Sequence, residues 1–438
     1  MTARLGTVHA RTLPWTDPLS VAAGLKDRHG ALALLSDGGP LGRWSWVACD
    51  PDRVHVGPAA AADPLAVLRL PEFATGTVGL ISYDAGARPA TGPRAEVWPD
   101  LMLARYPAML GFDHQTRRVR VIGRGVDAAT ARVAGDTAEG WLAAAVPVPV
   151  PAAPALAFAA EAPDQAYRAA VQDVIDRIAD GELFQANIAR AWGGDLGPGT
   201  DPFDVMLRLA GTRAAAYGAW WRLGDRALVS NSPEMFLAFE ASTGRIETRP
   251  IKGTRSRDVD PARDAALARD LKASAKDRAE NLMIVDLMRN DLSRVARPGT
   301  VRVERLFEIE TLPTVHHLVS TVSGVARPDI TAADLLEATF PPGSITGAPK
   351  HQAMKVIAGH EPPRGPWCGS LFRIDDDGGL TASVLIRTAC FERRGGSWRY
   401  RALAGAGIVA DSEPEAELQE TTAKIRALRQ ALAGDQLE

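Results

Sequence analysis

The chain has 438 residues, of which 46% are hydrophobic and 24% are charged, and its formal net charge is -3 at pH 7. This length exceeds what one compact core normally fills, so we expect two domains or one large two-layer body. The near-neutral charge gives no global attraction to nucleic acid, and no apolar run is long enough to cross a membrane. We therefore exclude nucleic-acid-binding and membrane-spanning classes.

The three cysteines, Cys49, Cys368 and Cys390, lie far apart and form no Cys-x-x-Cys pair. We interpret them as reduced thiols, which excludes a disulfide framework and a cysteine metal site. The N-terminal residues 1–11 lack the apolar core of a signal peptide. Together these features predict a cytoplasmic protein.

Residues 1–145 are predicted as short strands broken by Gly, Pro and Asp. We expect a closing helix over 128–145 and strands over 31–35, 44–48, 78–83 and 119–122. Alternating prolines follow in residues 146–154, and such a sequence favours an extended spacer. We therefore divide the chain into an N-terminal region (1–145), a Pro-rich linker (146–163) and a second domain (164–438).

The second domain opens with a predicted helix from Asp164 to Gly181, in which apolar residues recur at helical spacing. A strand is expected over 183–192. There Gln185 and Asn187 alternate with apolar residues, so both polar side chains lie on one face. Further strands are expected over 216–221, 227–230 and 235–240.

Residues 248–257 are predicted as a loop in which Lys252 lies among Arg249, Arg255 and Arg257. Neighbouring guanidinium groups disfavour an ammonium ion, and a lysine that sheds its proton is a nucleophile. Two alternatives are a solvated basic loop without chemistry and a lysine paired with a carboxylate.

The stretch 258–278 carries charges of both signs, which is typical of a solvated helical face rather than a nucleic-acid site. A helix over 280–291 and strands over 301–306 and 315–322 follow. In the second strand His316 and His317 face opposite sides, so at most one serves a given site.

The last part of the chain is predicted to end in a helix over 415–432. It is preceded by a helix over 332–340, a loop over 341–350, a helix to residue 359, and strands over 384–391 and 398–403. On the final helix Glu417, Glu420 and Lys424 lie at i, i+3 and i+7 beside an apolar stripe. Carboxylates in this position suit Mg²⁺, and the alternative is simple ion pairing between Glu420 and Lys424.

Two glycine-rich segments do not fit nucleotide-binding motifs. Residues 405–410 match a loose dinucleotide pattern, but the helix that should follow is absent. Residues 343–350 have the wrong spacing for a phosphate loop. We therefore predict no nucleotide cofactor.

Ordered motifs in this chain resemble the chorismate-utilising enzyme family from about residue 164 to residue 432. The motifs are 181–187, 232–234, 249–254, 280–291, 317–320, 342–350, 386–388, 405–407 and 411–420. The N-terminal region is similar to the family more weakly, at 43–51 and 79–84. The resemblance implies an α+β fold with two large, mainly antiparallel β-sheets packed face to face and helices outside.

Within that family, the residues at two positions distinguish which reaction a member catalyses. Anthranilate synthases usually carry alanine at the position of Lys252, whereas members that form 4-amino-4-deoxychorismate carry lysine. Isochorismate and salicylate synthases place a water-activating lysine at the position of Gln185, and glutamine has no basic lone pair. Both positions favour amination of chorismate at C4, toward 4-aminobenzoate and folate. The alternatives are an anthranilate or isochorismate synthase, and an inert ligand-sensing subunit.

The resemblance also implies roles for individual residues. Lys252 is the expected nucleophile, and Glu234 the general acid that protonates the leaving hydroxyl. Glu280 and Glu417, with Glu420, are expected to hold Mg²⁺ against the ring carboxylate. The expected substrate contacts are Arg387, Gly405, Ala406, Gly407, Lys424, His317, Gln185, Trp367 and Thr254, with Ser344 and Thr346 as lesser candidates.

Some positions depart from the family pattern, and one function is missing. Trp367 stands where relatives commonly have tyrosine, and Phe372-Arg373 replaces a usual Gly-Tyr. Segments 35–37 and 43–45 differ from the family's tryptophan-binding sequences, so tryptophan binding stays open. No cysteine has the setting of a glutaminase nucleophile, so we expect a separate glutamine amidotransferase subunit to supply ammonia.

Overall fold

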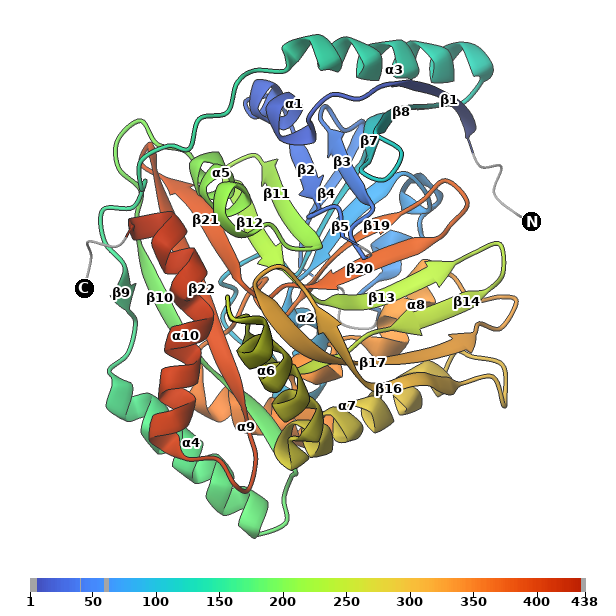
Figure 1. Ribbon diagram of the computed structural model, residues 1–438. Helices are drawn as coiled ribbons and strands as arrows, with labels where there is room; N and C mark the ends of the chain where they lie inside the picture. The colour runs from blue at the N-terminus through green and yellow to red at the C-terminus, as the bar shows by residue number, and fades with distance from the viewer. Residues whose placement is uncertain (1–5, 40, 59–62, 435–438) are drawn as a thin grey trace.

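The computed structural model describes residues 6–39, 41–58 and 63–434, so the outermost residues of the predicted regions, 1–5 and 435–438, lie outside it. Two large sheets form the body, and every strand pair among the described residues is antiparallel (Figure 1). The predicted α+β class with two antiparallel sheets is confirmed.

The first sheet has 12 strands. Their order is β1 (Thr7–Pro14), β8 (Arg118–Gly125), β7 (Ala108–Asp113), β3 (Trp44–Ala48), β2 (Leu32–Leu35), β11 (Tyr217–Leu223), β12 (Arg226–Ser232), β21 (Thr388–Arg394), β22 (Ser397–Ile408), β10 (Gln185–Asp195) and β18 (Gly347–Ala348), with β9 (Ala159–Ala160) against β10.

The second sheet has 10 strands. Their order is β15 (Ile251–Ser256), β17 (Val315–Val325), β14 (Arg245–Thr248), β13 (Met235–Glu240), β20 (Leu380–Val384), β19 (Ser370–Ile374), β5 (Thr77–Ile81), β6 (Leu101–Arg105) and β4 (Arg53–Gly57), with β16 (Arg302–Thr311) against β17.

Ten α-helices connect or cover these strands in the described part of the chain. They are α1 (Pro18–Leu25), α2 (Tyr83–Thr91), α3 (Ala128–Gly140), α4 (Asp164–Ala179), α5 (Pro202–Arg213), α6 (Pro261–Ala273), α7 (Ala275–Ser293), α8 (Ala332–Thr339), α9 (Lys350–His360) and α10 (Pro414–Ala433). None of these helices is long and apolar enough to span a membrane.

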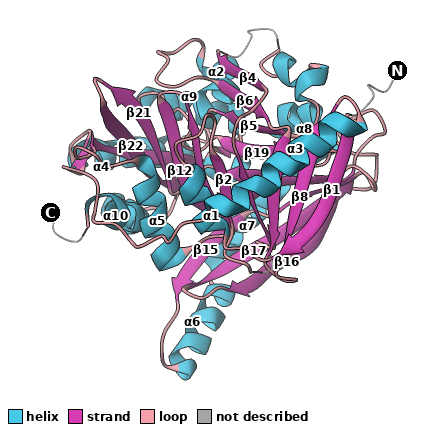
Figure 2. Cartoon of the chain, turned by 90° about the horizontal axis from the view of Figure 1, so that it is seen from above, coloured by secondary structure: helices cyan, strands magenta, loops and turns pink. Residues whose placement is uncertain are grey.

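Apolar side chains from the two sheets meet in one core. Leu80 of β5 and Leu371 of β19 belong to the same buried cluster as Leu110 of β7 and Ala219 of β11. Alternate residues of a strand point to opposite faces, so each sheet presents one face to this core. The other faces are covered by helices, with α4 and α10 on β10 and β22 and α3 along β8 (Figures 1 and 2).

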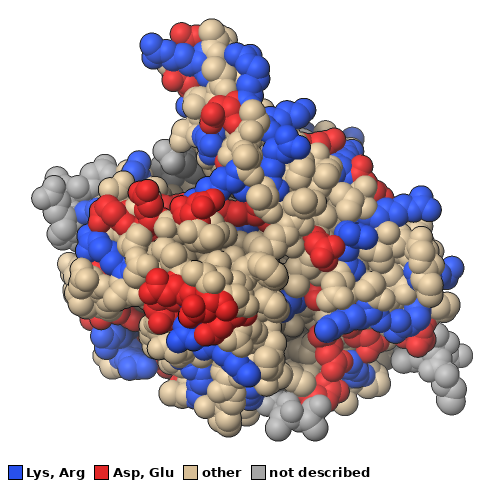
Figure 3. Space-filling model, turned by 90° about the horizontal axis from the view of Figure 1, so that it is seen from below, with Lys and Arg blue, Asp and Glu red and all other residues tan. Residues whose placement is uncertain are grey.

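Helix α6 projects from the body at one edge of the second sheet, as the view from above shows (Figure 2). The space-filling view from below shows acidic and basic side chains interspersed on this projection (Figure 3). Most residues of α6 are exposed, and Leu271 is its one fully buried residue among those described. The helix is therefore the solvated charged element that the mixed charges predicted.

Strands from both predicted regions share both sheets. In the first sheet β2 pairs with β11, and in the second β5 pairs with β19. The segment 146–163 between them has no helix and, apart from the short strand β9 and an isolated bridge at Ala155, no strand pairing. The division into two domains stays a prediction, and both sheets take strands from either side of it.

Two local predictions were wrong. Lys252 lies on the strand β15, not in a loop, although pairing with β17 is irregular between Ile251 and Thr254. Gly253 has a φ of 84° at that irregularity, a conformation that glycine adopts at little cost. The predicted strand over 384–391 is two strands, because the chain leaves the second sheet after Val384 and enters the first at Thr388.

The helices α1, α2 and α5 were not predicted. Helix α2 contains a glycine and an internal proline, both poor helix formers, and α1 begins with a proline. Asp17 caps α1 and Asp201 caps α5 through side-chain hydrogen bonds to backbone N–H groups. Capping of this kind fixes a helix start but is a weak signal in a sequence that also predicts turns.

Candidate active site

The site lies where the chain crosses twice, side by side, between the two sheets. Glu234 lies in the crossing from β12 to β13, and Arg387 in the crossing from β20 to β21. The Asn231 N–H donates to the Arg387 carbonyl at 3.0 Å, and the Val384 N–H donates to the Glu234 carbonyl at 3.1 Å. These backbone bonds hold the two predicted site residues in adjacent segments.

Glu234 is 4% exposed and is the most perturbed carboxyl group of the predicted site. Burial raises the pKa of Glu234 to about 7, against the opposing effects of a hydrogen bond from Ser344 and the charge of Lys252. A carboxyl group with this pKa exists in both protonation states near neutrality. Such a group can donate and accept a proton in one reaction cycle.

Lys252 is not surrounded by the positive charges that its sequence neighbours suggested. Arg249 pairs with Glu310, Arg255 with Asp270 and Asp277, and Arg257 with Asp264. The Lys252 Nζ atom lies 3.7 Å from Glu280, and its side chain is 11% exposed. The structure therefore agrees better with the alternative of a lysine paired with a carboxylate. The arginines are paired with other carboxylates, and Glu280 is beside Lys252.

His317 faces the site and His316 faces away from it, as the alternation predicted. The His317 Nδ1 atom lies 2.8 Å from the Thr254 hydroxyl, whereas His316 binds Thr311 and Asp264. Burial, together with the charge of Arg387, lowers the pKa of His317 to about 4. The imidazole is therefore neutral at physiological pH, and its Nε2 atom has no hydrogen-bond partner among the described residues.

The strands β10 and β22 form the floor of the site. A Cβ atom at Gly407 would lie 3.1 Å from Gln185 Nε2 and 3.2 Å from Lys252 Nζ. A Cβ atom at Gly405 would lie 2.9 Å from the Trp367 ring. Ala406, between them, points to the opposite face and packs in the core cluster that includes Ile188. The glycines therefore let Gln185, Lys252 and Trp367 approach the β22 backbone closely, and Ala406 offers the site only its backbone.

Several buried polar atoms around this floor lack hydrogen-bond partners within the described chain. They are both amide atoms of Gln185, Asn187 Oδ1, His317 Nε2 and Trp367 Nε1. Buried polar groups in folded proteins are normally hydrogen-bonded. Gln185, Asn187 and Trp367 lie against the two glycines of β22, and unpaired polar atoms gathered there indicate a ligand site.

The three predicted metal carboxylates each lie beside a lysine. Glu280 is 3.7 Å from Lys252, Glu417 is 3.7 Å from Lys276, and Glu420 is 2.6 Å from Lys424. Lys424 also donates to the Gly405 carbonyl at 2.9 Å, which ties α10 to the site floor. Among the described residues no three acidic, histidine or cysteine side chains are grouped closely enough to form a metal site.

Burial and neighbouring charges together shift the pKa values of the two α10 carboxyl groups, Glu417 and Glu420, in opposite directions. Burial raises the pKa of Glu417, an effect that the neighbouring Glu420 reinforces. For Glu420 burial also acts upward, but the adjacent Lys424 ammonium holds its pKa below the usual value. The end of α10 that faces the site therefore carries one well-compensated carboxylate and one poorly compensated one.

The loop over 341–350 is anchored to helix α7. The Lys350 ammonium donates to Asp291 at 2.6 Å and to the Thr339 carbonyl at 3.0 Å. Within the loop Thr346 donates to the Pro342 carbonyl, so its hydroxyl serves the turn. Ser344 bonds Glu234 instead and is the loop hydroxyl that the structure brings into the site.

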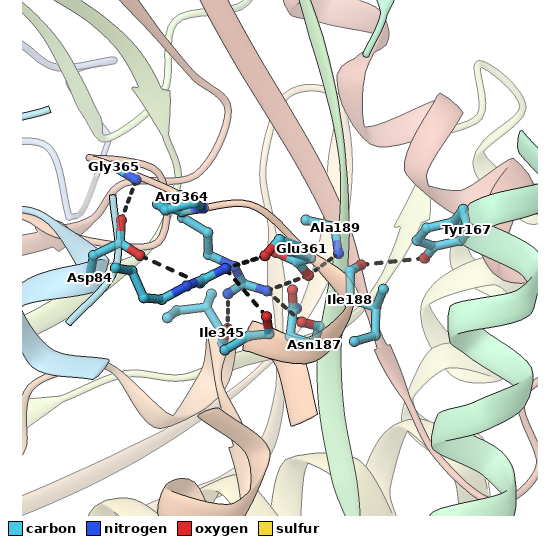
Figure 4. A network of polar contacts seen from close by, with 12 residues as sticks. Asp84, Tyr167, Asn187, Ile188, Ala189, Ile345, Glu361, Arg364 and Gly365 are labelled. Atoms are coloured by element: carbon cyan, nitrogen blue, oxygen red, sulfur yellow. Dashed lines mark hydrogen bonds and ion pairs between the residues drawn. The ribbon is translucent and has the colours of Figure 1, made fainter. Parts of the chain in front are cut away.

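A buried ion pair behind β10 was missed by sequence reasoning (Figure 4). Arg364 donates to both oxygens of Glu361 at 2.8 and 2.9 Å, to the Asn187 carbonyl at 2.6 Å and to the Ile345 carbonyl at 3.3 Å. Glu361 in turn accepts the Ala189 N–H at 2.7 Å. The only sequence signal is the i, i+3 spacing of opposite charges, which is common on solvated surfaces.

This pair takes the place of a missing strand. On one edge β10 pairs with β18 only at Gln185 and Ala186, and with β9 at Trp192 and Gly193. Arg364 and Glu361 satisfy backbone groups in the interval between those pairings. The Arg364 guanidinium also lies over the Trp367 ring, with its Cζ atom 5.0 Å from the ring centroid.

Two hollows on the surface lie away from these residues. One of about 360 Å³ is lined by Ala268, Arg269, Lys272, Glu308 and Ile309. The other, of about 200 Å³, lies between α4 and α9 beside Arg177 and His360. Neither contains a predicted site residue, and the site is assigned on the chemistry of its side chains.

The fold and the arrangement of acids and lysines define an enzyme of the two-sheet chorismate class, and comparison with known proteins agrees. Residues 53–430 match the family described as chorismate binding enzyme. Aminodeoxychorismate synthase component 1 of Klebsiella aerogenes is 39% identical over 410 residues, which cover 91% of this chain and 86% of that protein. Anthranilate synthase component 1 of Aeropyrum pernix is 38% identical over 374 residues, which cover 82% of this chain and 78% of that protein.

A solved structure shows the same relation. Anthranilate synthase component I from Streptococcus pneumoniae superposes with a TM-score of 0.76 at 27% identity, covering 88% of this chain and 92% of that chain. This chain belongs to the chorismate binding enzyme family, as its motifs predicted, and is a chorismate-utilising enzyme.

The buried ion pair predicts the result of a substitution. Arg364→Met leaves the Glu361 carboxylate buried without its partner, so we expect a loss of about 3–5 kcal/mol in the free energy of unfolding. Glu361→Gln in the same chain should recover part of that loss, but not the bonds to the Asn187 and Ile345 carbonyls. Urea unfolding of the three variants measures this. Arg394→Met, which breaks a pair exposed to solvent, is the matched control and should change stability by less than about 1 kcal/mol.

The pKa of Glu234 predicts a pH dependence of stability. Because burial raises the folded-state pKa to about 7, folding favours the protonated form, and that contribution is lost as the pH rises toward and past 7. Between about pH 5.5 and about pH 8 the wild type should lose about 2 kcal/mol of stability relative to Glu234→Gln, which does not titrate. Urea unfolding of both proteins at the two pH values checks this, and equal pH dependence would contradict it.

Proposed function

We propose that this chain is an aminodeoxychorismate synthase component 1, which converts chorismate and ammonia to 4-amino-4-deoxychorismate. The observation that carries the proposal is the nearly buried Lys252, whose Nζ atom lies beside Gln185 and Gly407 on the site floor. Overall similarity does not choose between family members, since relatives of two activities are 39% and 38% identical. The choice between the two activities therefore rests on the side chains at the reaction site.

Lys252 and Gln185 together favour amination over the related reactions. A lysine at the floor offers a nucleophile to the ring, whereas glutamine at the neighbouring position cannot deprotonate water. Without the water-activating lysine at the position of Gln185, attack by water to give isochorismate is disfavoured. Attack on the ring by the Lys252 amine is therefore the favoured first step.

The proposed reaction is two additions with migration of the double bonds. Neutral Lys252 attacks C2 of chorismate, the double bonds shift, and the C4 hydroxyl leaves as water after protonation. Ammonia then adds at C4, the double bonds shift back, and the lysine is expelled from C2. Chorismate and ammonia thus give 4-amino-4-deoxychorismate and water, with the lysine regenerated.

Glu234 suits the proton transfers that this scheme needs. Hydroxide is a poor leaving group, so the C4 hydroxyl requires a proton donor. A carboxyl group with a pKa of about 7 holds that proton at neutral pH and can later return to its acidic form. Before attack, the Lys252 ammonium must lose a proton. Glu280 lies 3.7 Å from it, and Glu234 and Glu420 are close enough for its charge to act on them.

Chorismate carries two carboxylates, and the site offers cations for both. Arg387 can bind one of them in a fork, and Lys424 adds charge beside the Gly405 carbonyl. Trp367 can donate its indole N–H, which has no partner among the described residues. Neutral His317, held by Thr254, presents its second nitrogen to the same space.

Glu280, Glu417 and Glu420 are the proposed magnesium ligands on the chemistry of their carboxylates alone, since among the described residues the three are not grouped closely and each lies beside a lysine. They supply hard oxygen donors from two helices, and Mg²⁺ usually takes one or two protein carboxylates plus ligand oxygens. The raised pKa of the nearly buried Glu417 shows that its negative charge is poorly compensated. When bound, the ion would supply positive charge against a substrate carboxylate.

Ammonia is proposed to come from a separate glutamine amidotransferase subunit. The thiolate is the nucleophile of a cysteine glutaminase. Cys49, Cys368 and Cys390 are all buried, and burial raises the pKa of each thiol. The similar protein from Klebsiella aerogenes is itself named a component 1.

The runner-up is an anthranilate synthase, favoured by the 38% identity to the Aeropyrum pernix protein. That reaction also starts from chorismate and ammonia but places the amine at C2 and loses pyruvate. The product distinguishes the two.

Product analysis tests the proposal. With chorismate, Mg²⁺ and an ammonium salt, the wild type should give a C4 amine that keeps its pyruvyl group, identified by mass and NMR. Lys252→Ala should lose that product by at least about a hundredfold or form another one, because the covalent route is removed. Lys355→Ala, on the exposed side of α9, is the control and should behave as the wild type. Anthranilate from the wild type would reassign the reaction.

The metal proposal has its own test. Removal of divalent ions with a chelator should abolish turnover, and added Mg²⁺ should restore it. Glu417→Gln should raise the Mg²⁺ concentration needed for half activity by at least about tenfold, because a ligand carboxylate is lost. Glu415→Gln, an exposed residue of the same helix paired with Arg168, should leave that concentration unchanged. Unaltered activity in the chelator would refute a metal role.

A further inference from the structure

Asn187 has an unsatisfied acceptor in the site and was not among the predicted site residues. Its side chain is 6% exposed, and its Oδ1 atom has no hydrogen-bond partner among the described residues. Leaving a buried polar group unpaired costs about 1–3 kcal/mol. A cost of that size at a functional site calls for a ligand that removes it.

The backbone N–H and carbonyl groups of Asn187 are both hydrogen-bonded, so the position of its Cα atom on β10 is fixed. Its N–H donates to the Thr346 carbonyl at 2.9 Å, and its carbonyl accepts from Arg364 at 2.6 Å (Figure 4). It stands opposite Gly407 in the pairing of β10 with β22. The Arg364–Glu361 pair thus fixes the strand at the residue whose amide is unsatisfied.

The Asn187 side chain points to the site floor. A Cβ atom at Gly405 would lie 2.5 Å from its Oδ1 atom, so the amide lies directly against this glycine. Gln185 is two residues earlier and therefore on the same face of β10. The Trp367 ring lies against the same face of Gly405, and its indole nitrogen has no partner among the described residues.

An amide oxygen accepts hydrogen bonds, so its partner must be a donor. The carboxylates and the enol ether of chorismate are acceptors at neutral pH. The C4 hydroxyl is the donor on chorismate, and ammonia brings N–H groups to the same carbon. Both substrates of the proposed function therefore present their donors at C4.

We propose that Asn187 binds substrate, with its side-chain oxygen accepting a hydrogen bond from the group at C4, either the departing hydroxyl or the arriving ammonia. This proposal rests on the proposed function for the ammonia arm only. An acceptor that holds an N–H of ammonia turns the nitrogen lone pair away from itself and toward the ring. The amide cannot remove a proton, so it orients the nucleophile without competing with Glu234.

The test uses Asn187→Leu in the full chain, which keeps the approximate shape and removes both polar ends. Two quantities are measured: the Kd of chorismate with Mg²⁺ and no ammonium salt, and the KM of ammonium at saturating chorismate. Loss of one hydrogen bond should raise one of them about tenfold. A raised Kd assigns the bond to the hydroxyl, and a raised KM alone assigns it to ammonia. If both stay within about twofold of the wild type, the proposal is wrong.

Stability separates this role from a structural one. Because Oδ1 has no hydrogen-bond partner among the residues that the structure describes, Asn187→Leu should unfold at the same temperature as the wild type or higher. Asn281→Leu is the matched control, since that buried amide binds Ser320 and Leu318 and its loss should lower the unfolding temperature. An equal loss of stability in Asn187→Leu would show a structural amide and overturn the proposal.

Two further results keep the test decisive. Asn187→Ser, which is polar but too short to reach the same position, should show the same weakened binding if the leucine variant does not fold. If the wild type forms a product other than the C4 amine, the proposed function fails. The chorismate Kd still tests Asn187, because chorismate carries its C4 hydroxyl in every reaction of this class.

Discussion

The buried ion pair between Arg364 and Glu361 is the interaction on which the site depends. A strand in the middle of a sheet needs partners on both edges, and β10 has a strand on only part of one edge. The guanidinium and the carboxylate provide the missing acceptor and donor contacts there. Moving two charges out of water is costly, and the cost is offset only when each remaining hydrogen-bonding group is satisfied.

The same arginine also connects the elements that supply the reacting groups. It reaches the loop next to Ser344 through the Ile345 carbonyl and lies over the Trp367 ring. The following Gly365 N–H donates to Asp84, near the start of α2, at 2.7 Å. Arg364 and the adjacent Gly365 therefore contact three parts of the chain: the strand of Gln185 and Asn187, the loop that carries Ser344, and the N-terminal region.

Electrostatics in the site follow from how completely each charge is paired. Glu420 has an adjacent lysine and keeps its charge, whereas Glu234 is fully desolvated and holds its proton up to about neutral pH. Two carboxyl groups of the same predicted site thus have pKa values shifted in opposite directions, because one is buried without an adjacent ammonium and the other lies beside one. The polar atoms on the floor that have no hydrogen-bond partner in the described part of the chain are the groups available to a ligand.

The sequence alone was sufficient for the family, the two-sheet class and most strand positions, because ordered motifs and alternation are local properties of the chain. The same motifs placed Lys252, Glu234, Glu280 and Glu417 in the predicted site, and their catalytic and metal-binding roles stay predictions. Tertiary structure alone decided the partners of those groups. The arginines near Lys252 pair with carboxylates elsewhere in the chain, and the strand predicted over 384–391 is divided between two sheets. The Arg364–Glu361 pair and the Asn187 oxygen were identified only in the structure. Burial and pairing depend on residues far apart in the chain, and no local pattern records them.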